Sequence, residues 1–237
     1  MNAALQAHEH ADWYLDDRRQ VGLDFADPAQ VATYDARQRA TDAAAAALLD
    51  ELGVQPGQAL ADLGCGTGVL ACQAALKGCH VHAVDISAAM LLATEARART
   101  LGAQGLQLHQ AGFLHWQVPA DSLDWVTTQY ALHHLGDFWK LVALQRIRAA
   151  LREGGQLLLR DVVFSCPPAE LGATVEAWLD WMSRERGYSR ADSATHVRDE
   201  HSTFDWVMQG LLQRAGFQVL QTTLARGVYA TYRAVKA

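Results

Sequence analysis

The chain has 237 residues, a formal net charge of −6 at pH 7 and an apolar fraction of 50%. This length suits one large domain, and the apolar fraction provides enough side chains for a sizeable core. The acidic balance argues against a nucleic-acid backbone as the main partner, because phosphate contacts need clustered Lys and Arg. No apolar run reaches the roughly 18 residues that a membrane span needs, so no membrane segment is expected.

The N-terminal residues and the cysteines predict a cytoplasmic protein. Residues 8–17 carry several charges and lack the apolar core of a signal peptide. The four cysteines form no C-x-x-C pair, which is typical of free thiols in a reducing compartment. The sequence leaves open whether the protein is a monomer or a homodimer.

Helix and strand patterns alternate along most of the chain. Residues 41–54 are alanine-rich with helical spacing, and Thr41 can cap the start while Gly53 can end the helix. A short apolar run at 58–64 predicts the first strand, and helical spacing follows over 68–78. The later elements, in chain order, are a strand at 80–86, a helix at 87–102, strands at 106–113 and 122–130, a helix at 137–155, a strand at 156–164, a helix at 202–216 and strands at 217–224 and 227–237.

This alternation predicts an α/β fold with helices on both faces of a mostly parallel sheet. We expect a Rossmann-like sheet of seven strands whose last strand is antiparallel, because the final two strands are too close in sequence for a crossover helix. The chain is interpreted as one domain, 1–237. Its parts are an N-terminal cap at 1–40, a core at 41–165, a helical lid insertion at 166–201, and a closing helix and strand pair at 202–237.

Glycine occupies every second position of one stretch, ADLGCGTG, at Gly64, Gly66 and Gly68. Open parallel sheets bind ligands at the carboxyl ends of their strands, where this loop is expected. Missing Cβ atoms let the backbone approach a ligand, and the following helix offers free N–H groups. Asp85, near the end of the second strand, can accept hydrogen bonds from both hydroxyls of a ribose. The spacing G-x-G-x-G differs from the dinucleotide fingerprint G-x-G-x-x-G, which argues against a nicotinamide-dependent oxidoreductase.

Four stretches carry a resemblance to a known family. ALADLGCGTG and HAVDIS resemble the first two motifs of class I S-adenosylmethionine-dependent methyltransferases. LDWVTTQYALHHL resembles the fourth-strand motif, and LREGGQLLLRD resembles the L-x-P-G-G turn into the fifth strand, with Glu153 where proline is usual. The resemblance is closest to the ubiquinone/menaquinone-biosynthesis-like, type 11 branch. It implies S-adenosyl-L-methionine as cofactor, S-adenosyl-L-homocysteine as product and a small-molecule acceptor.

The resemblance also implies cofactor-binding roles at the matching positions. Asp62 would hold the amino group of the cofactor, Asp85 its ribose, and Ile86 and Met90 would pack on adenine. At Gly112 the family often has an acidic residue that accepts from the adenine amino group, so this chain departs from the pattern there. The full set of implied cofactor residues is Asp62, Gly64, Cys65, Gly66, Asp85, Ile86, Met90, Gly112, Phe113 and Gln129.

The acceptor is expected at the ends of the fourth and fifth strands, under the cap and the lid. The candidate acceptor residues are Tyr14, Arg18, Tyr34, His134, Asp161, Trp178 and Arg198. His133 and His201 are the candidate general bases, because the pKa of histidine lies near the working pH. No metal site is predicted, because His133 and His134 are adjacent and are expected to point apart.

Two other functions stay open beside transfer to a small molecule. One is an RNA or protein methyltransferase, although the stretch TQYALHHL lacks the Asn/Asp-Pro-Pro-aromatic element that many amino-group methylases carry. The other is a non-catalytic regulator that binds S-adenosylmethionine, which only an activity assay separates from an enzyme.

Overall fold

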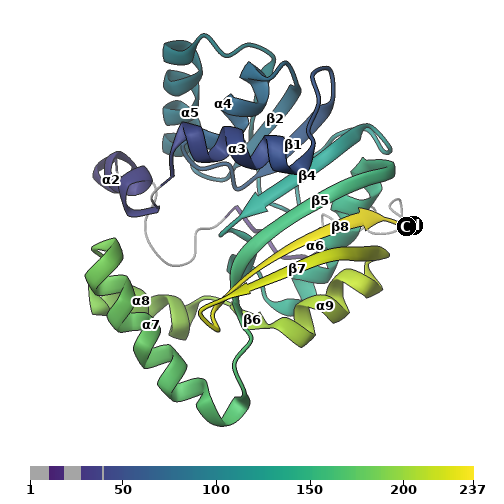
Figure 1. Cartoon of the computed structure of the whole chain (residues 1–237). Helices are drawn as coiled ribbons and strands as arrows, with labels where there is room; N and C mark the ends of the chain where they lie inside the picture. The colour runs from purple at the N-terminus through teal and green to yellow at the C-terminus, as the bar shows by residue number, and fades with distance from the viewer. Residues whose placement is uncertain (1–10, 19–27, 39) are drawn as a thin grey trace.

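The computed structural model describes residues 11–18, 28–38 and 40–237. Seven strands form the main sheet in the order β3-β2-β1-β4-β5-β8-β7 (Figure 1). The pairings among β1 to β5 are parallel, whereas β8 lies between β5 and β7 and is antiparallel to both. The expected Rossmann-like sheet with an antiparallel last strand is therefore confirmed. The strands are β1 (Ala59–Leu63), β2 (His80–Asp85), β3 (Leu106–Gln110), β4 (Leu123–Gln129), β5 (Leu151–Phe164), β7 (Phe217–Ala225) and β8 (Tyr229–Lys236).

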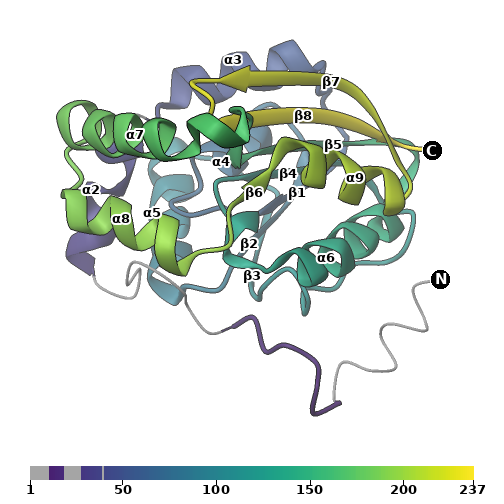
Figure 2. The ribbon, with the colours of Figure 1, turned by 90° about the horizontal axis from the view of Figure 1, so that it is seen from below.

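Helices cover both faces of this sheet, as Figures 1 and 2 show. One face carries α3 (Asp42–Leu52), α4 (Val69–Leu76) and α5 (Ala88–Leu101), and the other carries α6 (Asp137–Ala150) and α9 (Asp205–Arg214). Successive strand residues feed the two cores, because side chains alternate along a strand. In β1, Leu60 packs in the cluster under α3 and α4, and its neighbour Ala61 packs in the cluster under α6 and α9.

Cap residues mark the ends of two helices beside the glycine stretch, and Thr41 and Gly53 are the expected ones. The Thr41 hydroxyl accepts from the backbone N–H of Ala44 at the start of α3, and Gly53 ends that helix with a left-handed φ of 77°. The Ser87 side chain accepts from the N–H of Met90 at the start of α5. These local signals fix the ends of both helices.

The predicted helix at 137–155 is five residues too long, because α6 ends at Ala150. Leu151 is already extended, with φ −69° and ψ 138°, and pairs with Leu123 of β4. Gly154 and Gly155 thus lie within β5 and not at a helix end. The register of the β4–β5 pair shifts between Leu123 and Trp125 of β4.

The predicted helix at 202–216 also starts later than expected. Thr203–Phe204 form a short strand, β6, that pairs with Val163 and Phe164 at the end of β5, and α9 begins only at Asp205. Strand pairing therefore overrides local helical spacing at this point.

Helices lie beyond the carboxyl ends of the parallel strands. The segment between β5 and β6 holds the short turn η2 (Pro168–Glu170), α7 (Leu171–Arg186) and α8 (Arg190–Asp199). With α2 (Pro28–Gln38) they stand at one end of the sheet (Figure 1). Parts of the predicted N-terminal cap, at 1–10, 19–27 and 39, lie outside the described residues. Within the described residues, no helix has the length and apolar character to cross a bilayer.

Candidate active site

The glycine stretch forms a tight loop between β1 and α4. Gly64, Gly66 and Gly68 all have left-handed φ angles, of 71°, 55° and 76°, which residues with a Cβ rarely adopt. A Cβ at Gly64 would also overlap the side chain of Ala131, and one at Gly68 would overlap Thr94. Both the backbone conformation and the close packing therefore require glycine in this loop.

Asp85, at the end of β2, holds the glycine loop in place. Its Oδ2 accepts from the N–H of Gly66 at 2.9 Å, and its Oδ1 accepts from the N–H of Ser87 at 2.8 Å. Burial raises the pKa of this carboxyl above its usual value, while the backbone hydrogen bonds oppose that shift. A carboxylate offers about four lone-pair positions, so Asp85 can still accept from a ligand in the cavity that it lines.

A cavity of about 210 Å³ lies in front of the loop, and we call it the glycine-loop cavity. Its walls are mostly apolar and come from the ends of β1, β2 and β4 and the loop after β3. It contains seven of the ten implied cofactor residues: Gly64, Gly66, Asp85, Ile86, Met90, Gly112 and Phe113. The other three, Asp62, Cys65 and Gln129, line an adjoining cavity of about 540 Å³ beside α3, the α3 cavity, which shares Gly64.

The buried Asp62 lies at the end of β1. Its Oδ1 accepts from the hydroxyl of Thr127 at 2.7 Å, and burial raises its pKa to about 6 despite that hydrogen bond. Gln129 follows Thr127 by two residues in β4, and its side chain accepts from Arg160 Nη1 at 3.1 Å. A carboxylate and an amide thus border the α3 cavity, and both suit the charged groups of an amino acid.

A carboxylate from another part of the chain lies beside Gly112. Asp17 reaches this position from the N-terminal segment and lines the glycine-loop cavity. Its carboxylate accepts from the N–H of Leu114 at 2.8 Å and pairs with Nδ1 of His115 at 2.6 Å. A Cβ at Gly112 would overlap this carboxylate. A side chain at position 112 and the Asp17 carboxylate would therefore occupy the same space. The sequence alone does not reveal this, because the two residues are far apart along the chain.

A third cavity, of about 460 Å³, lies under α7 and α8, and we call it the lid cavity. Trp178 lines it, and its Nε1 donates to the hydroxyl of Tyr229 at 2.8 Å. Its aromatic residues are Tyr34, Tyr130, Trp178, Trp181, Tyr188 and Tyr229, and its arginines are Arg37, Arg160, Arg186 and Arg226. Arg160, Arg186 and Arg226 form no ion pair with a carboxylate in the described part of the chain. The cavity is therefore both aromatic and positively charged.

The three cavities meet at two tyrosines. Tyr34 of α2 and Tyr130 after β4 line all three, and His134 lines both the glycine-loop cavity and the lid cavity. Tyr130 has a φ of 54°, which is strained for a residue with a bulky side chain. The Tyr34 ring would touch a Cβ at Gly66 at 3.3 Å, so it lies directly on the glycine loop.

His133 is buried between two carboxylates. Its Nδ1 lies 2.5 Å from Asp161 Oδ1, and its Nε2 lies 3.2 Å from Glu200 Oε2. Burial alone would lower the pKa of His133, but Asp161 and Glu200 raise it to about 9. The ring is then protonated at neutral pH and has no free nitrogen to accept a proton. This geometry contradicts the expected role of His133 as a general base.

The pKa of the neighbouring His134 is shifted in the opposite direction. Burial and the adjacent His133 lower the pKa of His134 to about 3, so this ring is neutral. The two ring centroids are only 4.4 Å apart, so the expectation that these side chains point apart is wrong. That expectation assumed a regular helix or strand, whereas both residues lie in the short 3₁₀ turn η1 (Leu132–His134).

Four predicted residues lie away from the three cavities. The side chain of His201 is exposed, although its backbone N–H donates to the carbonyl of His133 at 2.8 Å. Arg18 and Arg198 are exposed and pair with Asp16 and Asp199. Tyr14 is buried against Trp139, with ring centroids 5.2 Å apart, and anchors the N-terminal segment. These four residues therefore lie outside the three cavities, and a role for them in acceptor binding or catalysis stays a prediction.

Three of the other predicted acceptor residues do gather at the site. Tyr34, His134 and Trp178 line the lid cavity. Asp161 is 1% exposed and acts on His133 instead of facing the cavity. The prediction missed Asp17, Arg186, Arg226 and Tyr229, for which the sequence gives no local signal. Glu200 lies within the predicted lid insertion, where a pocket residue was expected, and pairs with His196 at the end of α8.

This geometry defines the general class of the protein. A glycine loop after β1, an acid at the end of β2 and cavities at the carboxyl edge of a parallel sheet are typical of α/β proteins that bind a nucleoside-containing cofactor.

Comparisons with known proteins narrow the class. Residues 60–155 match the family model of a methyltransferase domain. An uncharacterized methyltransferase of Bacillus mycoides (strain KBAB4) is 30% identical over 172 residues, which cover 71% of this chain and 73% of that protein. A second, from Bacillus thuringiensis (strain Al Hakam), is 29% identical over 168 residues, with the same coverage of both chains.

Solved structures share the fold at low identity. A SAM-dependent methyltransferase from Aquifex aeolicus superimposes with a TM-score of 0.65 at 16% identity, covering 89% of this chain and 99% of that one. Magnesium protoporphyrin IX methyltransferase from Synechocystis PCC 6803, with bound S-adenosylhomocysteine, gives 0.62 at 18% identity over 100% of both chains. The chain belongs to the class I S-adenosylmethionine-dependent methyltransferases and is an enzyme with that cofactor. The narrower ubiquinone-like branch stays a prediction.

Proposed function

We propose that the protein transfers the methyl group of S-adenosylmethionine to a small molecule bound in the lid cavity. The observation that carries this proposal is the shared wall: Tyr34, Tyr130 and His134 line both the glycine-loop cavity and the lid cavity. A cofactor in the first cavity and an acceptor in the second would meet there. A cavity of about 460 Å³ suits a small molecule, because ligand sites of this kind span about 300–1,000 Å³.

The residues of the glycine-loop cavity fit the adenosyl part of the cofactor. Asp85 has acceptor positions left for the two ribose hydroxyls, and Ile86, Met90 and Phe113 offer apolar walls for adenine. In this proposal Asp17 accepts from the adenine amino group, in place of the acid that the family often has at Gly112. That role follows from its carboxylate lying where a Gly112 side chain would start.

The α3 cavity would take the amino-acid end of the cofactor. Asp62 and Gln129 border it, and it shares Gly64 with the glycine-loop cavity. An ionised Asp62 can pair with the cofactor's amino group. Bound in this way, the cofactor supplies a methyl group that its sulfonium already activates.

The lining of the lid cavity indicates the kind of acceptor. Six aromatic rings favour an apolar or aromatic body. Arg160, Arg186 and Arg226 have no carboxylate partner among the described residues, so an anionic group on the acceptor would complement them. We therefore propose an acceptor that combines an aromatic or apolar body with a carboxylate or phosphate.

The protein's main contribution in this proposal is positioning. Holding two reactants in line is worth up to about 7–11 kcal/mol of the barrier in favourable cases. Tyr34 and Tyr130 would set the approach between the two cavities, and the strained φ of Tyr130 indicates that its ring position matters. The lid would exclude water from the reacting groups.

Calorimetric titration with S-adenosylmethionine, S-adenosylhomocysteine and NAD⁺ tests the cofactor part. Micromolar binding of the first two without NAD⁺ binding is expected. The acceptor part is tested by release of S-adenosylhomocysteine with aromatic carboxylates and phosphates and with their uncharged alcohol analogues. Turnover of the anionic compounds supports the proposal. Methylation of total RNA or protein with no small-molecule turnover would overturn it, and cofactor binding without any transfer would favour a regulator.

Two tryptophan variants, one in the lid cavity and one on the exposed surface, separate acceptor binding from cofactor binding. Trp181→Ala removes a ring from the lid cavity and should lower acceptor turnover while the affinity for S-adenosylhomocysteine stays unchanged. Trp206→Ala is the matched control, because that side chain is 73% exposed and lines none of the three cavities. Equal effects of both variants would contradict the assignment of the lid cavity.

A further inference from the structure

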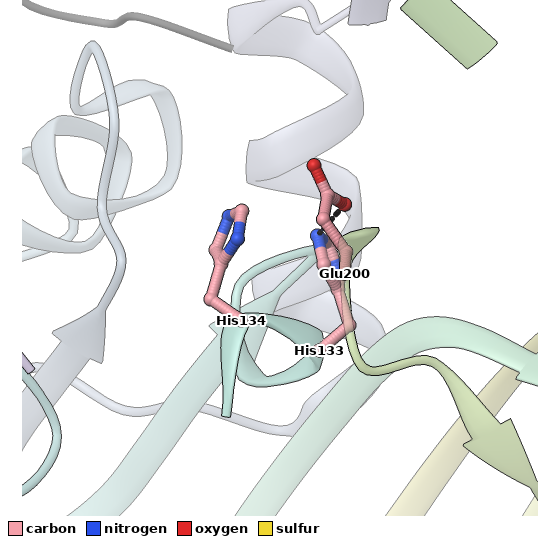
Figure 3. A group of neighbouring side chains, drawn as sticks. All are labelled: His133, His134 and Glu200. Atoms are coloured by element: carbon pink, nitrogen blue, oxygen red, sulfur yellow. Dashed lines mark ion pairs between the residues drawn. The ribbon is translucent and has the colours of Figure 1, made fainter. Parts of the chain in front are cut away.

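Two adjacent histidines and a glutamate converge at the wall of the lid cavity. His133 and His134 come from η1, and Glu200 comes from the residue that follows α8 (Figure 3). One ligand atom from each of the three lies within 4.8 Å of the other two. All three residues line the lid cavity, so an ion among them would be open to that space.

Asp161 fixes the orientation of the His133 ring. Its Oδ1 holds Nδ1 of the ring at 2.5 Å, and its Oδ2 accepts from the backbone N–H of the same residue at 2.9 Å. This leaves Nε2 facing Glu200, with 3.2 Å between Nε2 and Oε2 (Figure 3). A carboxylate on the far nitrogen of a histidine is the usual support of a metal-binding imidazole, because it fixes the tautomer and the ring plane.

Two atoms of the cluster are buried without a hydrogen-bond partner among the described residues. They are Nδ1 of His134 and Oε2 of Glu200, although the latter lies within ion-pair distance of His133 and His196. Buried polar atoms are nearly always satisfied, and an exception needs a cause such as a bound ion. Within the group, Nδ1 of His134 is such an exception, whereas Oε2 of Glu200 is shared between the two histidine rings.

The charges around the cluster also favour a cation. Asp161 is 1% exposed and the Glu200 side chain is 7% exposed, so two carboxylates are held away from water. Buried carboxylates need a compensating positive charge. A divalent cation would balance both of them.

We propose that His133, His134 and Glu200 bind one divalent transition-metal ion of the Zn²⁺ or Co²⁺ type at the wall of the lid cavity. Two imidazoles favour these ions over Mg²⁺ and Ca²⁺, which prefer oxygen ligands. With bonds of about 2.0–2.2 Å, tetrahedral ligand atoms lie about 3.3–3.6 Å apart, so the cluster contracts by side-chain rotation on binding. Three protein ligands leave positions open toward the cavity. The site exists whether or not that cavity holds the acceptor.

Cobalt absorption of the chelator-treated full chain tests the site. Co²⁺ is expected to bind at one ion per chain, with visible ligand-field bands that added Zn²⁺ removes. Glu200→Gln and His134→Gln should each weaken Co²⁺ binding at least tenfold. His82→Asn is the matched control, because His82 and His109 form another close histidine pair, 2.9 Å apart, far from the lid on β2 and β3. It should leave the bands unchanged.

The outcomes are decisive in either direction. Absence of bands in the wild-type chain overturns the proposal, and so do bands that persist in His134→Gln but vanish in His82→Asn. Titration with S-adenosylhomocysteine shows that each variant is folded. If Glu200→Gln is not, His134→Gln decides, since the Nδ1 atom of His134 has no hydrogen-bond partner in the described chain. Because no acceptor is present, failure of the metal site is distinguishable from failure of the proposed function.

Discussion

Moving a carboxylate from position 17 to position 112 tests how adenine is recognised. Asp17 lies where a side chain at Gly112 would start, so the two positions compete for one space. We expect Asp17→Ala to weaken binding of S-adenosylhomocysteine, because the adenine amino group loses a charged acceptor. Hydrogen bonds to charged groups contribute about 1.5–3 kcal/mol, and about 2 kcal/mol corresponds to roughly thirtyfold in affinity.

The double variant separates a direct contact from anchoring. Asp17 also holds the N-terminal segment through Leu114 and His115, so its loss alone could act by releasing that segment. Asp17→Ala with Gly112→Asp restores a carboxylate at the same place but not the anchor. We expect the double variant to regain affinity to within about threefold of wild type, whereas Gly112→Asp alone, which overlaps Asp17, should lower both affinity and stability.

Isothermal titration calorimetry with S-adenosylhomocysteine measures all four corners of this cycle, and thermal unfolding reports their stability. Asp12→Ala is the matched control, because Asp12 lies in the same segment and is exposed. Wild-type affinity in Asp17→Ala would refute the adenine contact. A double variant no better than Asp17→Ala would show that Asp17 acts only as an anchor.

Three further predictions follow from the cofactor site. Asp85→Ala should weaken S-adenosylhomocysteine binding at least tenfold by calorimetry, because the ribose loses its hydrogen-bond acceptor and the glycine loop loses the hydrogen bond from Gly66 to Asp85. Unchanged affinity would refute the ribose assignment. Binding should fall about tenfold between pH 7.5 and pH 5, because the pKa of Asp62 is about 6 and only its ionised form pairs with an amino group; Asp62→Asn should be weak and pH-independent, and a pH-dependent Asn variant would contradict this origin. Gly64→Ala should lower thermal stability more than Gly53→Ala, because both have left-handed φ angles but only the first overlaps Ala131; equal losses would refute the packing argument.

The sequence predicted the sheet and the glycine loop because their signals are local. Apolar alternation, helix caps and the positions of Gly64 and Asp85 each depend on neighbours within a few residues. The end of α6 was wrong for the opposite reason. Leu151 continues a helical pattern in sequence, but pairing with Leu123 across the sheet pulls it into a strand. Non-local hydrogen bonds decided that boundary.

The acceptor side could be predicted only in part, because its wall is assembled from five separate segments: 34–38, 130–134, 160–162, 178–200 and 223–231. Trp178 and His134 stand in segments that topology already placed over the sheet edge. Arg226 and Tyr229 come from the closing hairpin, and nothing in their local patterns marks them. The same holds for Asp17, which reaches the glycine-loop cavity from the N-terminal segment. The protonation of His133 depends on Asp161 and Glu200, whose approach only the folded chain reveals.

Because β8 lies between β5 and β7, the sheet can be completed only after the last strand of the chain has been synthesised. β5 runs through the middle of the sheet, yet its partner on one side is made only after the lid helices and α9 have been synthesised. Until then a long strand, buried in the native state, presents an open edge, which is the kind of surface that recruits other chains. Closing this pair is a late, long-range step of the kind that slows folding. The same strand also brings Tyr229 to the lid cavity, so a nascent chain that has not yet closed its sheet has no complete acceptor wall.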